Sequence, residues 1–161
     1  MSGQGTFHYA NGDIYKGQWQ SNQAHGYGVY MHESGATYEG DWQDYMQHGF
    51  GVEKWTDGSK YEGHYVYDKK HGQGSYTYKD GSLYCGEWQA NRIHGKGTYQ
   101  WADGRQYTGD WADNNMHGKG VYRWQDGRVY EGEFVEGHRQ GHGVYLWKEG
   151  RKYEGQWHQG K

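Results

Sequence analysis

The 161-residue sequence contains no proline and only one cysteine, Cys85, and hydrophobic residues make up just 32% of it. One cysteine cannot form a disulfide within the chain, and such sparse use is typical of a reducing compartment. No apolar run reaches the roughly 18 residues that a membrane-spanning helix requires. The first residues also lack the charged and apolar regions of a signal peptide. We therefore expect a cytoplasmic protein.

An excess of charge of one sign is also lacking. The formal net charge is −3, and acidic and basic residues are interspersed along the chain. Such a mixture gives no general attraction to nucleic acid or to an anionic lipid surface. The sequence therefore predicts no nucleic-acid partner, and direct membrane binding is disfavoured.

What the chain does contain is glycine and aromatic residues, repeated with a strict period of 23 residues. Glycines number 30 and aromatic residues make up 19%, so we expect aromatic rings packed against glycine in place of an aliphatic core. Such a period is typical of arrays whose units bury their apolar faces against their neighbours. The recurring motifs are Tyr-x-Gly-x-aromatic, from Tyr15, Tyr38, Tyr61, Tyr84, Tyr107, Tyr130 and Tyr153, and Gly-x-Gly, from Gly3, Gly26, Gly49, Gly72, Gly95, Gly118 and Gly141.

The repeat predicts strands and hairpin turns. Glycine columns would cost about 1 kcal/mol per glycine inside helices, whereas the period-two spacing places Tyr38, Gly40 and Trp42 on one face of a strand. An Asp-Gly pair or a variant of it lies between the motifs and signals a turn. We therefore predict an all-β fold, a single elongated, twisted antiparallel β-meander of repeated hairpins with about fourteen strands. Its twist is expected to form a trough lined by Tyr, Trp and Gly.

The faces of the strands decide the length of the Asp-Gly turn. A two-residue loop would place Trp55 and Tyr61 on opposite faces of the hairpin. A three-residue loop over residues 56–58 pairs Trp55 with Ser59 and keeps the rings on one face. We therefore predict the three-residue loop.

This register also predicts which residues lie opposite each other. Trp42 lies across from Gly26 on the aromatic face, and Lys119 lies across from Glu133 on a charged face. The second connection, over residues 43–48, is expected to be a longer loop of about six residues.

These motifs resemble MORN (membrane occupation and recognition nexus) repeats, on segments such as Tyr38-Glu39-Gly40-Asp41-Trp42 and His94-Gly95-Lys96-Gly97-Thr98-Tyr99. The resemblance implies a single array over 1–161, with partial repeats at 1–14 and 153–161 and full repeats at 15–37, 38–60, 61–83, 84–106, 107–129 and 130–152. Single repeats depart from the pattern without a break in phase, at Glu53, Tyr65, Cys85, Thr108, Phe134 and Gln140.

The resemblance implies a non-enzymatic scaffold that binds cytoskeletal or other proteins, and itself, through the trough. MORN arrays occur in cytoskeletal and ciliary proteins, and the chain is similar to protozoan scaffolds built only of these repeats. A cytoskeleton-associated location is therefore expected. The chain starts and stops inside a repeat, so we expect a piece of a longer array.

No catalytic residue, metal or cofactor is predicted. An active site needs a unique convergence of groups, whereas the acids and histidines here stand in repeating columns. Members of the main histidine column should lie about 10 Å apart, too far to share a metal. We expect them to bond the backbone, while a metal bridging two chains, with Cys85 as a further ligand, stays an alternative. The column is His25, His48, His71, His94 and His117.

The aromatic trough is the candidate binding surface. Rings of the first strand of each repeat are predicted to form the core, whereas the outer aromatic rings near the turns are either core or a docking surface. In the last three repeats each outer tryptophan faces an arginine, in pairs that would be cation–π contacts of about 0.5–1 kcal/mol. The predicted partner-binding residues are Trp101, Arg105, Trp124, Arg128, Trp147 and Arg151.

The C-terminal end is predicted to form a homodimer. An open sheet has two unpaired edges, and no proline or atypical capping repeat protects them here. A second chain can satisfy such an edge through a two-fold contact. The residues predicted at this contact are Trp147, Arg151, Tyr153 and Trp157.

Two alternative functions stay open. A phosphoinositide- or membrane-associated adaptor would need a cluster of about four to eight basic residues, whereas the outer column of the first strands is acidic, with Lys16 its only basic member. Choline- or glycan-binding repeats of bacterial cell walls also use short Trp/Tyr/Gly hairpins, but they are secreted.

Overall fold

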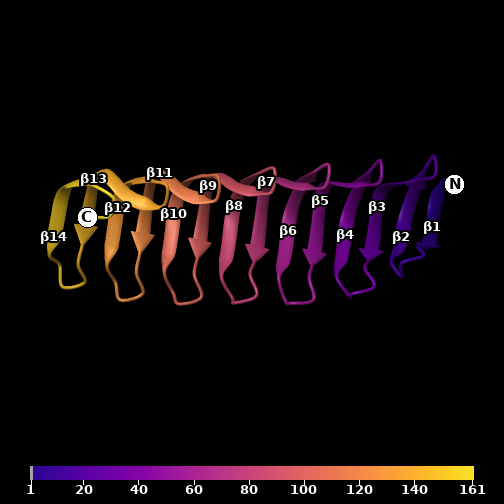
Figure 1. Cartoon of the computed structure of the whole chain (residues 1–161), viewed down its shortest axis with the longest axis horizontal. Helices are drawn as coiled ribbons and strands as arrows, with labels where there is room; N and C mark the ends of the chain where they lie inside the picture. Colours follow the sequence, from indigo (N-terminus) through magenta and orange to yellow (C-terminus); the bar gives the residue numbers. More distant parts are fainter. Residues whose placement is uncertain (1) are drawn as a thin grey trace. The chain divides into compact units, whose positions relative to one another are not determined.

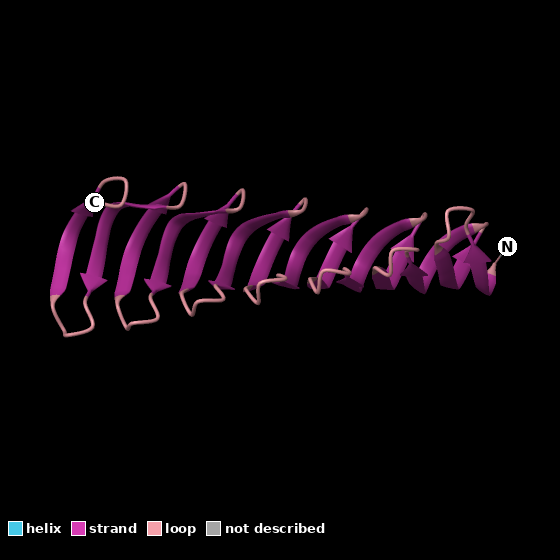
Figure 2. Cartoon of the chain, turned by 60° about the horizontal axis from the view of Figure 1, so that its bottom comes forward, coloured by secondary structure: helices cyan, strands magenta, loops and turns pink. Residues whose placement is uncertain are grey.

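The structure is a computed structural model that describes residues 2–161. Within these residues the fold is all-β, with fourteen strands in one open meander sheet and no helix (Figure 1). The strands follow one another in chain order and are joined only by loops (Figure 2). The predicted antiparallel meander is therefore confirmed.

From β2 onward the strands alternate between shorter and longer members. They are β1 (Gly3–His8), β2 (Ile14–Gln20), β3 (Gln23–Met31), β4 (Thr37–Gln43), β5 (Met46–Lys54), β6 (Lys60–Val66), β7 (Lys69–Thr77), β8 (Leu83–Gln89), β9 (Arg92–Gln100), β10 (Gln106–Ala112), β11 (Asn115–Arg123), β12 (Val129–Val135), β13 (His138–Leu146) and β14 (Lys152–Trp157).

The chain forms two compact units. Unit 1 runs to Lys79 and includes residues 89–91, and unit 2 comprises residues 80–88 and 92–161. The single array expected over 1–161 stays a prediction.

The Asp-Gly turn is the three-residue loop that the sequence predicts. The Gly58 N–H donates to the Trp55 carbonyl (3.1 Å), and the Trp55 N–H donates to the Ser59 carbonyl (3.0 Å). Gly58 has a φ of 95°, a conformation that glycine adopts without steric cost. In unit 2, Trp124 and Arg128 close the equivalent loop with an N–H to carbonyl bond of 3.0 Å.

The second connection is a two-residue turn, so the predicted loop of about six residues over 43–48 is wrong. Strand β4 ends at Gln43 and β5 begins at Met46, while Asp44 and Tyr45 between them have φ values of 51° and 69°. Two successive positive φ angles define a type I′ turn. The turn was missed because no glycine marks it. Of the residues counted as loop, Gln43 pairs with Met46 and Gln47 pairs with Trp42, and a bulge in β5 follows at residues 48–50, opposite the stretch between Gly40 and Trp42.

The core of each unit is a column of tyrosines stacked on glycines. Tyr15 is fully buried, and its hydroxyl donates to the Gln18 carbonyl (2.8 Å). A Cβ added to Gly28 would lie 2.5 Å from Cζ of Tyr15, so only glycine leaves room for the ring. Burial raises the pKa of Tyr15 to about 12. The other members are as fully buried, with exposures of 1% or less: Tyr38, Tyr61, Tyr84, Tyr107 and Tyr130.

Tryptophans of the shorter strands complete this core, as predicted. Trp42 lies across from Gly26 in the register, and its indole N–H donates to the Gly28 carbonyl (3.2 Å). In unit 2, the Trp111 indole N–H donates in the same way to the Gly97 carbonyl (3.1 Å). Both of these rings therefore have their polar atom satisfied inside the core.

The opposite face carries the predicted charge pairs and a further set of hydrogen bonds. Lys119 lies across from Glu133. The carboxylate of Glu133 also accepts the backbone N–H of His142 (3.0 Å), which the bulge leaves without a partner strand atom. Between β2 and β3 the side-chain oxygen of Gln18 accepts the Tyr27 N–H in the same way (2.7 Å). The acidic column therefore has a structural role that the sequence did not indicate.

Candidate functional site

The main candidate site is a continuous row of aromatic rings in unit 2, called the aromatic ladder. Its rings alternate between a tyrosine at the end of a long strand and the tryptophan two residues later, at the start of the turn. Neighbouring centroids lie 4.6–5.4 Å apart. The ladder consists of Tyr99, Trp101, Tyr122, Trp124, Tyr145 and Trp147.

Two of the three ladder tyrosines are more deeply buried than the tryptophans. Tyr122 and Tyr145 are only 8% and 6% exposed, whereas Trp101, Trp124 and Trp147 are half-buried. The three-residue turn produces this arrangement, because it returns the chain without moving the tryptophan to the other face. The outer tryptophans therefore present part of each ring to a partner.

Each tryptophan of the ladder has an arginine beside it, as the sequence predicts. The guanidinium carbons of Arg105, Arg128 and Arg151 lie 5.1, 4.9 and 5.0 Å from the ring centroids of Trp101, Trp124 and Trp147. These distances are within the range of cation–π attraction. The predicted role of the six residues in partner binding stays a prediction.

Carboxylates in the turns fix the arginines in place. Nε of Arg128 lies 2.8 Å from the Asp126 carboxylate, and its Nη1 donates to the Tyr145 hydroxyl (3.1 Å). The Arg128 guanidinium lowers the pKa of Asp126. Arg105 is held in the same way, by a 2.8 Å bond to Asp103. Each Trp–Arg pair is therefore close to neutral overall.

A hollow of about 350 Å³ lies between two of these pairs. It is lined by both polar and aromatic groups, from Asp103, Arg105, Trp124, Gln125, Asp126 and Arg128.

Arg139 in β13 also lies beside the aromatic ladder. It was not among the partner-binding residues predicted from the sequence. Its guanidinium carbon lies 4.5 Å from the Trp157 ring and 5.9 Å from the Trp124 ring, and Nη2 donates to the Gly160 carbonyl (2.8 Å). Among residues 2–161, no carboxylate forms an ion pair with it. The signal in the sequence was that the chemical class of this position changes from repeat to repeat, as Ala24, Gln47, Lys70, Ile93, Met116 and Arg139.

Unit 1 carries aromatic rings at the equivalent positions of its repeats, but a polar cluster interrupts them. Glu53 takes an aromatic position, and its carboxylate accepts the Tyr65 hydroxyl (2.6 Å). Burial, together with Glu53, raises the pKa of Tyr65. The Lys70 ammonium nitrogen lies 5.6 Å from the Trp55 and Tyr76 ring centroids, and burial lowers its pKa. The departures at Glu53 and Tyr65, which the sequence shows only as two separate changes, are thus a matched exchange.

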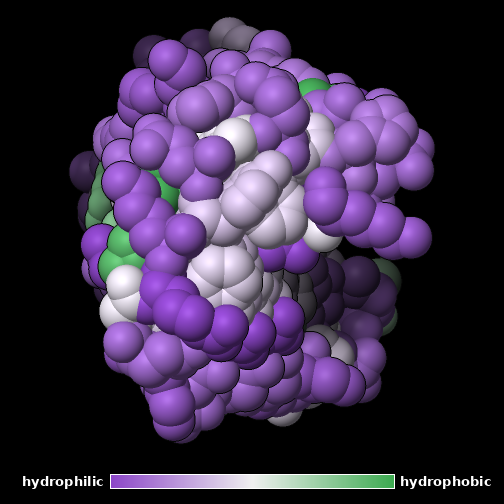
Figure 3. Space-filling model, turned by 90° about the vertical axis from the view of Figure 1, so that its left-hand side faces the viewer, coloured by the Kyte–Doolittle hydropathy of each residue, from purple (hydrophilic) through white to green (hydrophobic). Residues whose placement is uncertain are grey.

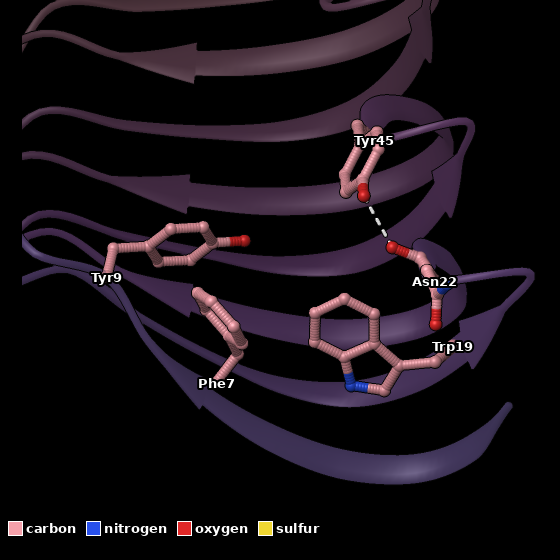
Figure 4. Close-up of a pocket in the computed structure, with 5 residues that line it drawn as sticks. All are labelled: Phe7, Tyr9, Trp19, Asn22 and Tyr45. Carbon is pink, nitrogen blue, oxygen red and sulfur yellow. Dashed lines mark hydrogen bonds between the residues drawn. The ribbon is translucent and has the colours of Figure 1, made fainter. Parts of the chain in front are cut away.

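Unit 1 contains a separate hollow of about 240 Å³, which is lined mostly by aromatic side chains (Figure 4). In it the Tyr45 hydroxyl donates to the Asn22 carbonyl. The hollow can take a small apolar group, and its lining residues are Phe7, Tyr9, Trp19, Asn22 and Tyr45.

The predicted dimerisation residues lie on β14 and the turn that leads into it. Tyr153 is 42% exposed, although its equivalents are buried in the core. The indole nitrogen of Trp157 is buried and has no hydrogen-bond partner within the described part of the chain. Residues of intermediate hydropathy are visible at this end of unit 2 (Figure 3). The dimerisation role of Trp147, Arg151, Tyr153 and Trp157 stays a prediction.

Three members of the histidine column, His48, His71 and His94, bond the backbone, as predicted. Nδ1 of His94 accepts the Asp113 N–H (3.3 Å), and Nδ1 of His48 accepts the Tyr67 N–H (3.3 Å). At the equivalent place, Oε1 of Gln140 accepts the Gln159 N–H (3.1 Å). Residues 2–161 contain no cluster of three or more His, Cys, Asp or Glu placed to hold a metal ion. In the same residues, no helix has the length and apolar character of a membrane span.

Comparison with known proteins places this geometry in a family. A model described as "MORN repeat" matches residues 1–14, 15–37, 38–60, 61–83, 84–104, 107–127, 130–150 and 153–161. No curated protein matches the chain.

Two solved structures are similar in fold. The SAS-4 (dCPAP) TCP domain of Drosophila melanogaster, in complex with a proline-rich motif of Ana2 (dSTIL), has a TM-score of 0.57 and 12% identity, over 96% of this chain and 85% of that one. The TCP10 domain of Danio rerio CPAP has a TM-score of 0.53 and 12% identity, over 94% of this chain and 71% of that one. At this identity the likeness concerns the fold alone. The family model, by contrast, matches nearly every residue, and the chain therefore belongs to the MORN repeat family.

Proposed function

We propose that this chain is a non-enzymatic scaffold that binds a segment of another protein on the aromatic ladder of unit 2. The observation that carries the proposal is the row of half-buried tryptophans, Trp101, Trp124 and Trp147, each with an arginine at about the same distance. Trp, Tyr and Arg are the residues that contribute most binding energy at protein interfaces.

The arginines support a binding surface because they are already ordered. The Arg128 guanidinium is held by a carboxylate, a tyrosine hydroxyl and the Trp124 ring. A partner therefore does not have to restrict this long side chain, which would otherwise cost about 0.5–1.5 kcal/mol per residue.

The family and the similar folds support the same class of function. One similar structure is described as a complex with a proline-rich motif of another protein, so a sheet of this kind can accept a protein segment. A cytoplasmic, cytoskeleton-associated location is part of the proposal and follows from the resemblance to MORN scaffolds.

Partner capture with altered tryptophans tests the proposal. The variant replaces Trp101, Trp124 and Trp147 together by histidine, which the same repeat position already accepts at His32. The matched control is Trp55→His in unit 1. We expect proteins captured from an extract by the parent protein to be lost with the triple variant and kept with the control. Identical partner lists for all three proteins, at unchanged thermal stability, would refute binding on the ladder.

Self-association through β14 is a second candidate. Two observations favour this contact: Tyr153 is 42% exposed, and the indole nitrogen of Trp157 is unpaired within the described residues. A strand of a second chain can cover the Tyr153 ring and supply a hydrogen-bond acceptor to the Trp157 indole. Light scattering tests it, with a dimer mass expected for the unaltered chain and a monomer mass for Tyr153→Asp. Tyr67→Asp is the control, since Tyr67 is 48% exposed but lies in unit 1. A monomer mass for the unaltered chain at micromolar concentration would exclude this contact.

A further inference from the structure

We propose that the segment bound on the aromatic ladder is proline-rich and acidic, and lies in the polyproline II conformation with one turn per repeat. The proposal rests on the proposed function and deepens it. One proline per turn stacks on each of Trp101, Trp124 and Trp147, and one acidic side chain reaches Arg139.

The spacing of the tryptophans supports the polyproline II conformation of the bound segment. Consecutive members are separated by one repeat, which is two strands of the sheet, or about 9.6 Å along the ladder. One polyproline II turn has three residues with a rise of 3.1 Å each, or about 9.3 Å. Residues i, i+3 and i+6 of such a segment therefore meet successive tryptophans, with a mismatch of only about 0.3 Å per repeat.

Other regular conformations fit this spacing less well. In a β-strand, three residues cover about 10 Å, but side chains at i and i+3 point to opposite faces. In an α-helix, the same-face residue whose spacing comes closest to the repeat is i+7, about 10.5 Å away, so the mismatch is about 0.9 Å per repeat. Polyproline II is thus the conformation that repeats in step with this surface.

The chemistry of the ladder agrees with proline. Flat, half-buried indole rings suit the proline ring, and a preformed polyproline II segment loses little entropy on binding. Residues 1–161 contain no proline, so a second copy of this array cannot supply the segment. The occupant is therefore a proline-rich segment from outside the array.

The unneutralised charge of Arg139 determines where the acidic residue of the bound segment lies. Asp103, Asp126 and Glu149 already neutralise the arginines beside the three tryptophans. Arg139 has no such carboxylate among residues 2–161, and its guanidinium lies 5.9 Å from the Trp124 ring. A partner carboxylate beside the proline on Trp124 makes a charge-assisted hydrogen bond there.

Arg139 also fixes the register of the partner. A periodic ligand on a periodic surface can slide by three residues without losing any stacking contact. The equivalents of Arg139 in the two preceding repeats are Ile93 and Met116, which offer no charge. A single acidic residue therefore selects one register among several, which makes Arg139 a specificity-determining residue.

Synthetic peptides titrated against the full chain test the proposal. The probe is a peptide of about nine residues, three polyproline II turns, with proline at every third position and one central glutamate. Its controls carry glutamine in place of glutamate, or glycine in place of every proline. Binding is followed by calorimetry and by tryptophan fluorescence. We expect the glutamate peptide to bind about tenfold more tightly than the glutamine peptide, and the glycine peptide not to bind.

Variants of the chain separate the two parts of the proposal. Arg139→Met, which installs the residue found at Met116, should weaken the glutamate peptide about tenfold and leave the glutamine peptide unchanged. Trp124→His should weaken both peptides, and Arg123→Gln, which removes an exposed charge with no ring contact among the described residues, should weaken neither.

Several outcomes would overturn the proposal. They are equal binding of the glycine peptide, tighter binding of a helical peptide, or an equal effect of Arg139→Met on both proline peptides. If no proline peptide binds, but the triple tryptophan variant still loses its captured partners, the scaffold function stands and the polyproline II segment is wrong. If both results are negative, the ladder is not a binding surface.

Discussion

Replacing Gly97 by alanine tests the packing that holds each repeat together. Gly97 lies in β9, and a Cβ there would be 2.5 Å from Cζ and 2.6 Å from Cε2 of Tyr84, a fully buried ring. The ring cannot rotate away without losing the bond from its hydroxyl to the Glu87 carbonyl (2.8 Å). The Gly97 carbonyl is itself held by the Trp111 indole (3.1 Å), so the backbone is also restrained.

The expected cost has two parts. Overpacking by one methyl group in a dense core costs about 1–3 kcal/mol, and loss of the tyrosine hydrogen bond costs about 1 kcal/mol. Together they lower the free energy of unfolding by about 3 kcal/mol, or the melting temperature by about 6–12 °C for a chain of this size. Thermal unfolding followed by tryptophan fluorescence measures the change.

The control for Gly97→Ala is Gly137→Asn. Gly137 has a φ of 84° and open space around a would-be Cβ, and Asn91 and Asn114 already occupy the same turn position with a φ of 71° each. We expect Gly137→Asn to leave stability within about 0.5 kcal/mol. If Gly97→Ala also leaves the free energy of unfolding within about 0.5 kcal/mol, the close stacking of tyrosine on glycine does not stabilise the repeat.

Three further predictions follow from hydrogen bonds of the repeat. His94→Gln should be tolerated, because Gln140 makes the equivalent bond, whereas His94→Leu should cost about 1 kcal/mol in denaturant unfolding. Glu133→Gln should likewise be tolerated, because Gln18 makes the equivalent bond between β2 and β3, and Glu133→Leu should cost about 1 kcal/mol in the same assay. A tyrosine hydroxyl lowers the pKa of Asp13. The ionised Asp13 therefore contributes stability above the ordinary carboxyl pKa, and this contribution is lost as the pH falls through the lowered pKa. Asp13→Asn should reduce the loss of stability below about pH 4, measured by urea titrations.

Much of the fold could be predicted because the repeat supplies the same signal many times. Placing Trp55 and Tyr61 on one face required a three-residue turn, and the structure contains it. The turn at Asp44 and Tyr45 could not be predicted in the same way, since left-handed backbone at residues other than glycine has a weak sequence signal.

The candidate site was only partly predictable. The Trp–Arg pairs, such as Trp124 with Arg128, were visible as two columns at a fixed spacing. Arg139 was not, because its closeness to Trp124 depends on the two-residue turn that brings β13 back beside β12. The exchange of Glu53 with Tyr65 was missed for a similar reason, since the two side chains meet across strands and 12 residues apart.

The two-residue turns also limit how such a chain can change in length. The backbone N–H of the second turn residue donates to a carbonyl one repeat earlier, as from Asn114 to Ile93 and from Gly137 to Met116 (2.9 Å each). One inserted residue in a turn would displace this donor and leave both groups unpaired. Insertion of 23 residues, by contrast, recreates the bond with the neighbouring repeat. During evolution, a chain of this kind is therefore expected to gain or lose whole repeats, so that its binding surface grows by one tryptophan at a time.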